Sequence, residues 1–86
     1  MRFQGSVIRE QGVTFGIVVV KPHVLQSENE KSQMQVLGRQ VFGSMPIVLM
    51  AQNAHGVPTY YGRPDIVRFL SRTAMYRIPW KEYHVA

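Results

Sequence analysis

The stretch Pro58-Thr-Tyr-Tyr-Gly-Arg-Pro-Asp-Ile-Val-Arg-Phe-Leu70 is typical of a short strand that turns directly into a helix. Proline suits the first position of a helix, because its φ angle is already helical and its missing N–H would have no partner there. We therefore expect a helix that begins at Pro64 and ends at about Arg72 or Thr73. Asp65 would lie in the first turn, where the helix dipole favours a negative charge.

This junction is also the first candidate site. The start of a helix presents free backbone N–H groups that can receive an anion. Arg63 could hold a carboxylate or a phosphate in a two-pronged contact. The predicted anion site therefore consists of Tyr60, Tyr61, Arg63 and Asp65. The alternative interpretation is that these residues only end a strand and start a helix.

Further strands are predicted on both sides of the junction. Val13 to Lys21 and Pro46 to Ala51 carry apolar side chains at consecutive positions, which is typical of interior strands covered on both faces. Weaker strand patterns occupy residues 2–9, 57–61 and 76–85. In the first of these, Gly5 indicates a partly exposed, bulged strand, and in the last, Pro79 restricts the strand to an edge of the sheet or to a bulge.

A second helix is predicted in the first half of the chain. Ser27 followed by Glu30 fits a capping box, in which the Ser side chain caps the helix and the Glu lies three residues later. Apolar residues recur with helical spacing up to Phe42. Gly43 is placed to end the helix. Gly38 inside the helix indicates either close packing or a weak point.

The elements follow one another as ββαββαβ, which predicts a single small α+β domain over residues 1–86. We expect a mixed sheet of about five strands packed with two helices, in which each strand–helix–strand unit joins parallel neighbours. The pattern leaves open whether the helices cover one face of the sheet or both. If they covered only one, the other face would be apolar and exposed, and it would favour a homodimer.

Composition narrows the classes of function. The chain has no cysteine, which excludes disulfides, thiolate metal ligands and a cysteine nucleophile. No apolar run is long enough to cross a membrane, and the N-terminus lacks the apolar core of a signal peptide. These features predict a soluble cytoplasmic protein without a membrane partner.

A formal net charge of +5 raises the possibility of nucleic-acid binding. The basic residues most suited to it lie near aromatic side chains in the second half of the chain: Arg63, Arg68, Arg72, Arg77 and Lys81. Aromatic residues on a sheet flanked by basic ones are a common way to hold single-stranded RNA. No block of consecutive basic residues and no RNP-type signature is present.

Catalysis has little support in the sequence. His23, His55 and His84 have no paired metal-ligand spacing, so no metal site is predicted. No two carboxylates are placed as an acid–base pair, and no glycine-rich phosphate loop is present. We predict no catalytic residue and no cofactor, and we lean against an enzyme.

The sequence therefore favours a small non-enzymatic binding domain that self-associates as a homodimer. Two alternatives stay open. One is weak binding of single-stranded RNA or DNA through the arginines named above. The other is a small anion or carboxylate site, with a possible enzyme activity, at the strand–helix junction of residues 58–66.

Overall fold

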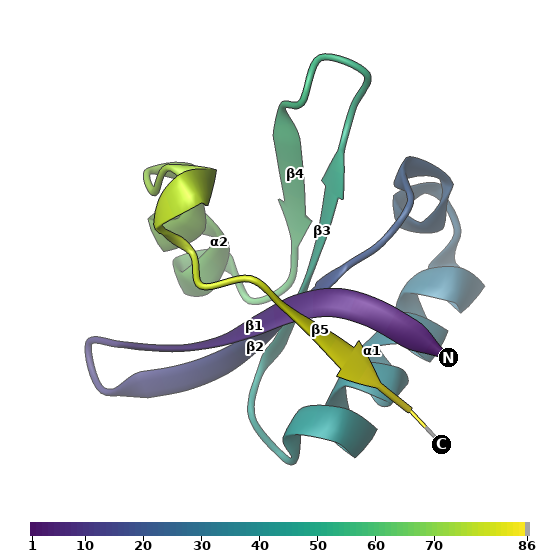
Figure 1. Cartoon of the computed structure of the whole chain (residues 1–86), viewed down its shortest axis with the longest axis horizontal. Helices are drawn as coiled ribbons and strands as arrows, with labels where there is room; N and C mark the ends of the chain where they lie inside the picture. Colours follow the sequence, from purple (N-terminus) through teal and green to yellow (C-terminus); the bar gives the residue numbers. More distant parts are fainter. Residues whose placement is uncertain (86) are drawn as a thin grey trace.

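The computed structural model describes residues 1–85, which form a five-stranded mixed sheet with one helix on each face (Figure 1). Short 3-10 helices, η1 and η2, precede α1 and follow α2. The elements in chain order are β1 (Arg2–Glu10), β2 (Val13–Val19), η1 (Pro22–Gln26), α1 (Glu28–Phe42), β3 (Ile47–Gln52), β4 (Pro58–Tyr61), α2 (Pro64–Ser71), η2 (Met75–Arg77) and β5 (Lys81–His84). This architecture confirms the predicted α+β class and the ββαββαβ order.

The strands lie in the order β4-β3-β2-β1-β5. Only β2 and β3 are parallel neighbours, and α1 connects them. The other pairs are antiparallel. The expectation that the second strand–helix–strand unit also joins parallel neighbours is wrong, because β4 and β5 lie at opposite edges of the sheet. After α2 the chain crosses over the sheet and adds β5 to the outer edge of β1.

One face of the sheet is covered by α1. Val18 and Leu49 point to this face and are completely buried, and Leu37 of the helix packs against the same cluster. Gly38 allows the close approach, since a Cβ atom there would lie 2.7 Å from a methyl group of Ile47. The structure therefore supports the close-packing interpretation of Gly38.

The opposite face is covered by α2. Ile17 and Val48 point to this side from neighbouring strands, and Ile66 and Leu70 of α2 pack on them. Each of these four side chains is at most 3% exposed. Alternate residues of β2 and β3 pack into the apolar clusters on opposite faces of the sheet. This is why these strands carry apolar side chains at consecutive positions. Both faces of the sheet are covered.

Turns and caps follow local chemistry. Gln11 and Gly12 have φ angles of 51° and 78°, which form a tight two-residue hairpin between β1 and β2. Ser27 caps α1 as predicted, because its Oγ accepts a hydrogen bond from the Glu30 N–H at 3.2 Å. Gly43 ends α1 with a φ angle of 94°.

The last strand is shorter than predicted. Residues 76–80 were expected to be extended, but η2 takes up the first of them and β5 begins only at Lys81. The Trp80 indole donates a hydrogen bond to the Met75 carbonyl at 3.0 Å, which holds this segment in a compact turn. Pro79 lies just before an edge strand, as predicted, and its carbonyl accepts a hydrogen bond from Ser6 Oγ at 3.1 Å.

β1 is partly exposed, as predicted, but the predicted bulge is wrong, because pairing is continuous at Gly5 with both neighbouring strands. Gly5 itself is buried. It is the one position of β1 that pairs with both neighbours, Val18 in β2 and Lys81 in β5. A Cβ atom there would lie 2.4 Å from the Ile17 carbonyl oxygen. Close backbone approach, and not a bulge, requires glycine at this position.

No helix among residues 1–85 is long and apolar enough to cross a membrane.

Candidate binding surface

The predicted anion site at the strand–helix junction contains an internal ion pair. Arg63 forms a two-pronged ion pair with Asp65, in which its Nε and Nη2 each lie 2.8 Å from a carboxylate oxygen. This guanidinium lowers the pKa of Asp65 to about 2. The helix start therefore already carries an anion, the Asp65 side chain, and the arginine expected to hold a ligand is engaged by it.

The two tyrosines of the junction point to opposite faces of the sheet. Tyr60 packs on the α2 side, where its hydroxyl is buried without a hydrogen-bond partner among the described residues. Burial raises the pKa of Tyr60. Tyr61 is exposed on the α1 side, with Lys31 Nζ 4.3 Å from its ring centroid. The four residues of the predicted anion site, Tyr60, Tyr61, Arg63 and Asp65, therefore do not converge on one point.

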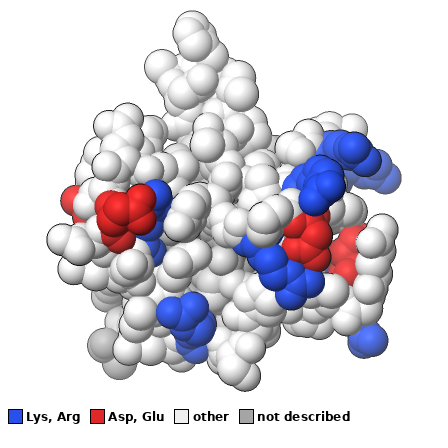
Figure 2. Space-filling view, turned by 180° about the vertical axis from the view of Figure 1, so that it is seen from behind, with Lys and Arg blue, Asp and Glu red and all other residues white. Residues whose placement is uncertain are grey.

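The arginines proposed for nucleic-acid binding are partly brought together. Arg68 of α2 and Arg72, which follows α2, line one shallow depression, and Arg72 and Arg77 line a second, adjoining one. Arg63 is held by Asp65, and Lys81 lies on β5 with its Nζ 5.8 Å from the Tyr83 ring centroid. Figure 2 shows basic side chains in separate groups with acidic ones among them, so the face in that view carries no continuous basic stripe.

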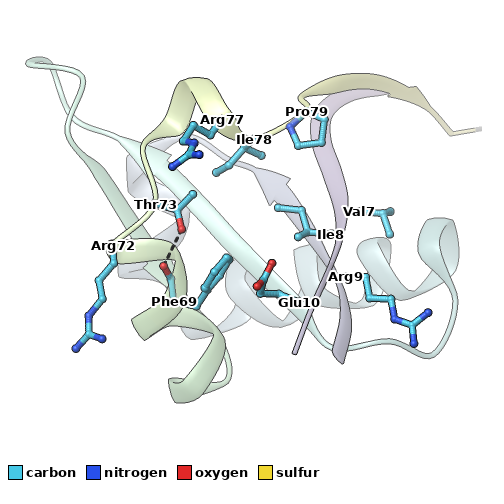
Figure 3. Close-up of a pocket in the computed structure, with 10 residues that line it drawn as sticks. All are labelled: Val7, Ile8, Arg9, Glu10, Phe69, Arg72, Thr73, Arg77, Ile78 and Pro79. Carbon is cyan, nitrogen blue, oxygen red and sulfur yellow. Dashed lines mark hydrogen bonds between the residues drawn. The ribbon is translucent and has the colours of Figure 1, made fainter. Parts of the chain in front are cut away.

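The larger depression lies between β1 and the end of α2, and we call it the β1-edge hollow. It has a volume of about 570 Å³ and is open to solvent. This size falls within the range of pockets that hold small ligands. Figure 3 shows its lining residues, which are Val7, Ile8, Arg9, Glu10, Phe69, Arg72, Thr73, Arg77, Ile78 and Pro79.

The base of the β1-edge hollow is apolar and well ordered by packing. Ile78 is only 4% exposed, and Ile8 and Phe69 pack against the same cluster. Thr73 Oγ1 donates a hydrogen bond to the Phe69 carbonyl at 2.9 Å, which ties down the chain where α2 ends (Figure 3). The hollow therefore offers apolar contact area with charged groups near its rim.

One wall of the hollow is a free strand edge. β5 pairs with β1 only over Arg2 to Gly5, so residues beyond Gly5 have no strand on that side. The two-residue hairpin makes Glu10 and Val13 a hydrogen-bonded pair, and alternation then directs the N–H and C=O of Val7 and Arg9 away from β2. Within residues 1–85, the N–H and C=O groups of Val7 and Arg9 form no backbone hydrogen bond to any other segment. These four backbone groups are available to a partner.

The side chains of β1 alternate about this edge. In Figure 3, Ile8 and Glu10 extend from β1 toward α2, whereas Val7 and Arg9 extend to the other side of the strand. No salt bridge to a described residue is formed by Arg9, Arg72 or Arg77. The hollow is thus bordered by arginines that have no internal counter-charge.

No metal centre is found in the described part of the chain, since no three His, Cys, Asp or Glu side chains gather within it. His23 lies 3.3 Å from Glu30, and His84 lies 3.4 Å from Glu82. His55 is in the exposed loop between β3 and β4. The three histidines are in separate parts of the molecule.

Sequence reasoning missed Arg9 and the edge of β1 as a site. Alternation in residues 2–9 indicated a strand, but the length over which β5 covers it depends on a pairing across the whole chain. A usable signal was present in Pro79, which restricts the length of the last strand.

Comparison of the chain with protein-family models, with curated proteins and with solved structures finds no match.

Proposed function

We propose that this chain is a small non-enzymatic interaction domain that binds an extended polypeptide strand along the outer edge of β1. The observation that carries the proposal is the free edge at Val7 and Arg9 beside the β1-edge hollow. An added strand supplies backbone hydrogen bonds to such an edge, and pockets for its alternate side chains provide specificity.

The site would accept only a short strand. Pro79 lies beside Ser6 at one end of the free edge, and the hairpin turn at Gln11 marks the other end. A strand paired with Val7 and Arg9 would place its intervening residue opposite Ile8. That residue would point into the hollow, toward Phe69 and Ile78.

The predicted homodimer is one form of this proposal, in which the strand comes from a second copy. With both sheet faces covered, an exposed apolar face no longer supports dimerisation, and the free edge of β1 is the route that we propose for it. Antiparallel pairing of two such edges centred on Ile8 would place Arg9 of each copy opposite Val7 of the other, so no acidic side chain would meet it. Both copies also carry the same net positive charge, so a different partner is favoured.

A titration with synthetic hexapeptides tests the proposal. A neutral peptide of alternating Thr and Val, at millimolar concentration, should shift the backbone amide signals of Val7 and Arg9 in a two-dimensional NMR spectrum. Arg9→Pro should abolish these shifts, because it removes an edge N–H that β2 does not use. Arg9→Ala is the matched control, since it retains the N–H and should retain the backbone response.

The same samples report on self-association. Light scattering at ~100 μM should show a monomer if charge repulsion dominates and a dimer if two edges pair. A dimer that Arg9→Pro converts to a monomer would identify the partner strand as a second copy. Unchanged Val7 and Arg9 amides with every peptide, in a protein that is monomeric, would refute strand addition.

A second candidate function is weak binding of single-stranded nucleic acid. It is favoured by the proximity of Arg68, Arg72 and Arg77, and by Tyr76, which is 89% exposed and could stack on a base. Binding of a generic oligonucleotide should weaken steeply with salt, because phosphate contacts release counterions. Arg68→Glu combined with Arg72→Glu should weaken it without loss of folding. No binding at low salt would eliminate this candidate.

The remaining predictions receive less support from the geometry. The anion site at the junction has its arginine paired with Asp65, and a phosphate titration that leaves the amides of residues 62–66 unshifted would eliminate it. A cytoplasmic location stays a prediction based on composition.

A further inference from the structure

We infer that the strand bound at the edge of β1 is acidic, with an acidic residue opposite Arg9 and an apolar residue opposite Ile8. This inference rests on the proposed function and specifies the chemistry of the partner. Its basis is the excess of positive charge on both sides of the free edge, with Arg72, Arg77 and a single Glu10 around the β1-edge hollow and Arg9 on the other side of β1 (Figure 3).

The alternation of β1 assigns a role to each position of the added strand. Residues paired across a sheet point to the same face, so the residue opposite Ile8 extends into the hollow. There it meets Phe69 and Ile78, which favour an apolar side chain. The residue opposite Arg9 extends to the other side of β1, where Figure 3 shows the Arg9 side chain reaching away from the hollow.

Arg9 has no acidic partner within the described residues, in contrast to Arg2 and Arg63, which pair with Glu82 and Asp65. An acidic residue directly opposite Arg9 would form a cross-strand ion pair. Arg72, just after α2, and Arg77 of η2 border the hollow, and neither forms a salt bridge with a described residue. Their positive charge also favours an acidic segment as it approaches.

Glu10 limits where the partner carries its acidic residues. Its side chain extends toward α2 on the same side as Ile8 (Figure 3). An acidic residue of the added strand directly opposite Glu10 would be repelled. The favoured pattern therefore alternates, with acidic residues on the Arg9 side of the strand and uncharged residues on the hollow side.

The acidic charge inferred for the partner also distinguishes binding of another protein at this edge from self-association. A second copy would present the same excess of arginine at its own edge, which is repulsive, and pairing centred on Ile8 would place Val7, and no acidic residue, opposite Arg9. A strand from a different, acidic protein meets no such repulsion. The occupant we commit to is therefore an extended acidic segment of another protein.

Three hexapeptides of one pattern test the inference: alternating Glu-Val, Thr-Val and Lys-Val, each blocked at both ends. We expect the Glu-Val peptide to bind about tenfold more tightly than the Lys-Val peptide at low salt, with the Thr-Val peptide between them. Arg9→Glu should reverse this order. Arg39→Glu is the matched control, because this exposed arginine lies on α1, outside the lining of the hollow, and the order should be retained.

The outcomes separate the two proposals. If all three peptides bind equally and Arg9→Pro abolishes their binding, strand addition stands and the acidic partner is refuted. If Glu-Val binding is unaffected by Arg9→Glu, or if an oligonucleotide binds in competition with every peptide and more tightly than the Glu-Val peptide, the acidic-strand inference is also refuted. If no peptide shifts the Val7 and Arg9 amides, both proposals fail.

Discussion

The two faces of the sheet are covered in different ways. On one face lies α1, a helix of 15 residues, whereas the opposite face has α2, a helix of 8 residues, followed by the short turn η2. Phe42 at the end of α1 reaches the far strands, where its ring contacts Phe3 of β1 and Tyr83 of β5. On the other face α2 ends before β1, and the β1-edge hollow lies between them.

This difference shows where a small domain can retain a binding surface. A long helix and an aromatic cluster cover the α1 face as far as Phe3 and β5, whereas Val7 on this face is 40% exposed. The shorter α2 leaves Ile8 and Phe69 half-buried beside a free strand edge. Because α2 covers this face incompletely, the face is less stabilised. The apolar side chains that stay uncovered provide the contact area of the candidate site.

The largest expected effect concerns the anchor of α2. Leu70 is 0% exposed, and Leu70→Ala should lower the free energy of unfolding by ~2–5 kcal/mol, through lost burial and the cavity left behind. Leu37→Ala on α1 is the matched control, because Leu37 is only partly buried and should cost less than half as much. Urea denaturation measures both. Equal losses would show that the short helix does not depend on one anchor.

The next effect concerns the backbone contact under the α1 face. Gly5→Ala should destabilise the protein by ~1–3 kcal/mol, because the added Cβ meets the Ile17 carbonyl oxygen and one strand must shift. Gly16→Ala should cost less, since its Cβ meets the ring of Phe42, a side chain that can move. Thermal unfolding of the two variants gives the comparison. A greater loss for Gly16→Ala would contradict this account of the packing.

Amide hydrogen exchange should reveal the free edge directly. The Val7 and Arg9 amides should exchange about tenfold or more faster than the Ile8 amide, whose N–H is directed at β2. The amides of Phe3 and Gly5, which β5 covers, serve as internal controls and should be protected. Slow exchange at Val7 and Arg9 would mean that another segment pairs with this edge.

The smallest effect concerns the ion pair at the start of α2. The pKa of Asp65 is lowered from 3.8 to about 2 by Arg63, so its contribution to stability is complete above about pH 4 and is lost as the pH falls through 2. Asp65→Asn should therefore be slightly less stable than the wild type at neutral pH, and this difference should vanish toward pH 2. Because both side chains are exposed, we expect a small change in the melting temperature. A difference that persists in strong acid would require another cause.

Local chemistry in the sequence was enough to predict most of the elements. The apolar runs of β2 and β3, the Ser27 cap and Pro64 at the start of α2 lie close to their predicted positions. These signals are reliable because each depends on neighbouring residues, such as a cap and its helix or a strand and its alternation. The α+β class followed from them.

The tertiary structure alone decided which of these elements meet. Whether α1 and α2 share a face depends on chain crossings that no local pattern encodes, and so does the pairing of β5 with only part of β1. The free edge at Arg9 arises from such placement, whereas the ion pair of Arg63 joins it to Asp65, only two residues further along the chain. The sequence by itself determined the strands, the helices and an excess of basic residues. Only the packing of distant segments decided that the edge of β1 at Val7 and Arg9 stayed open.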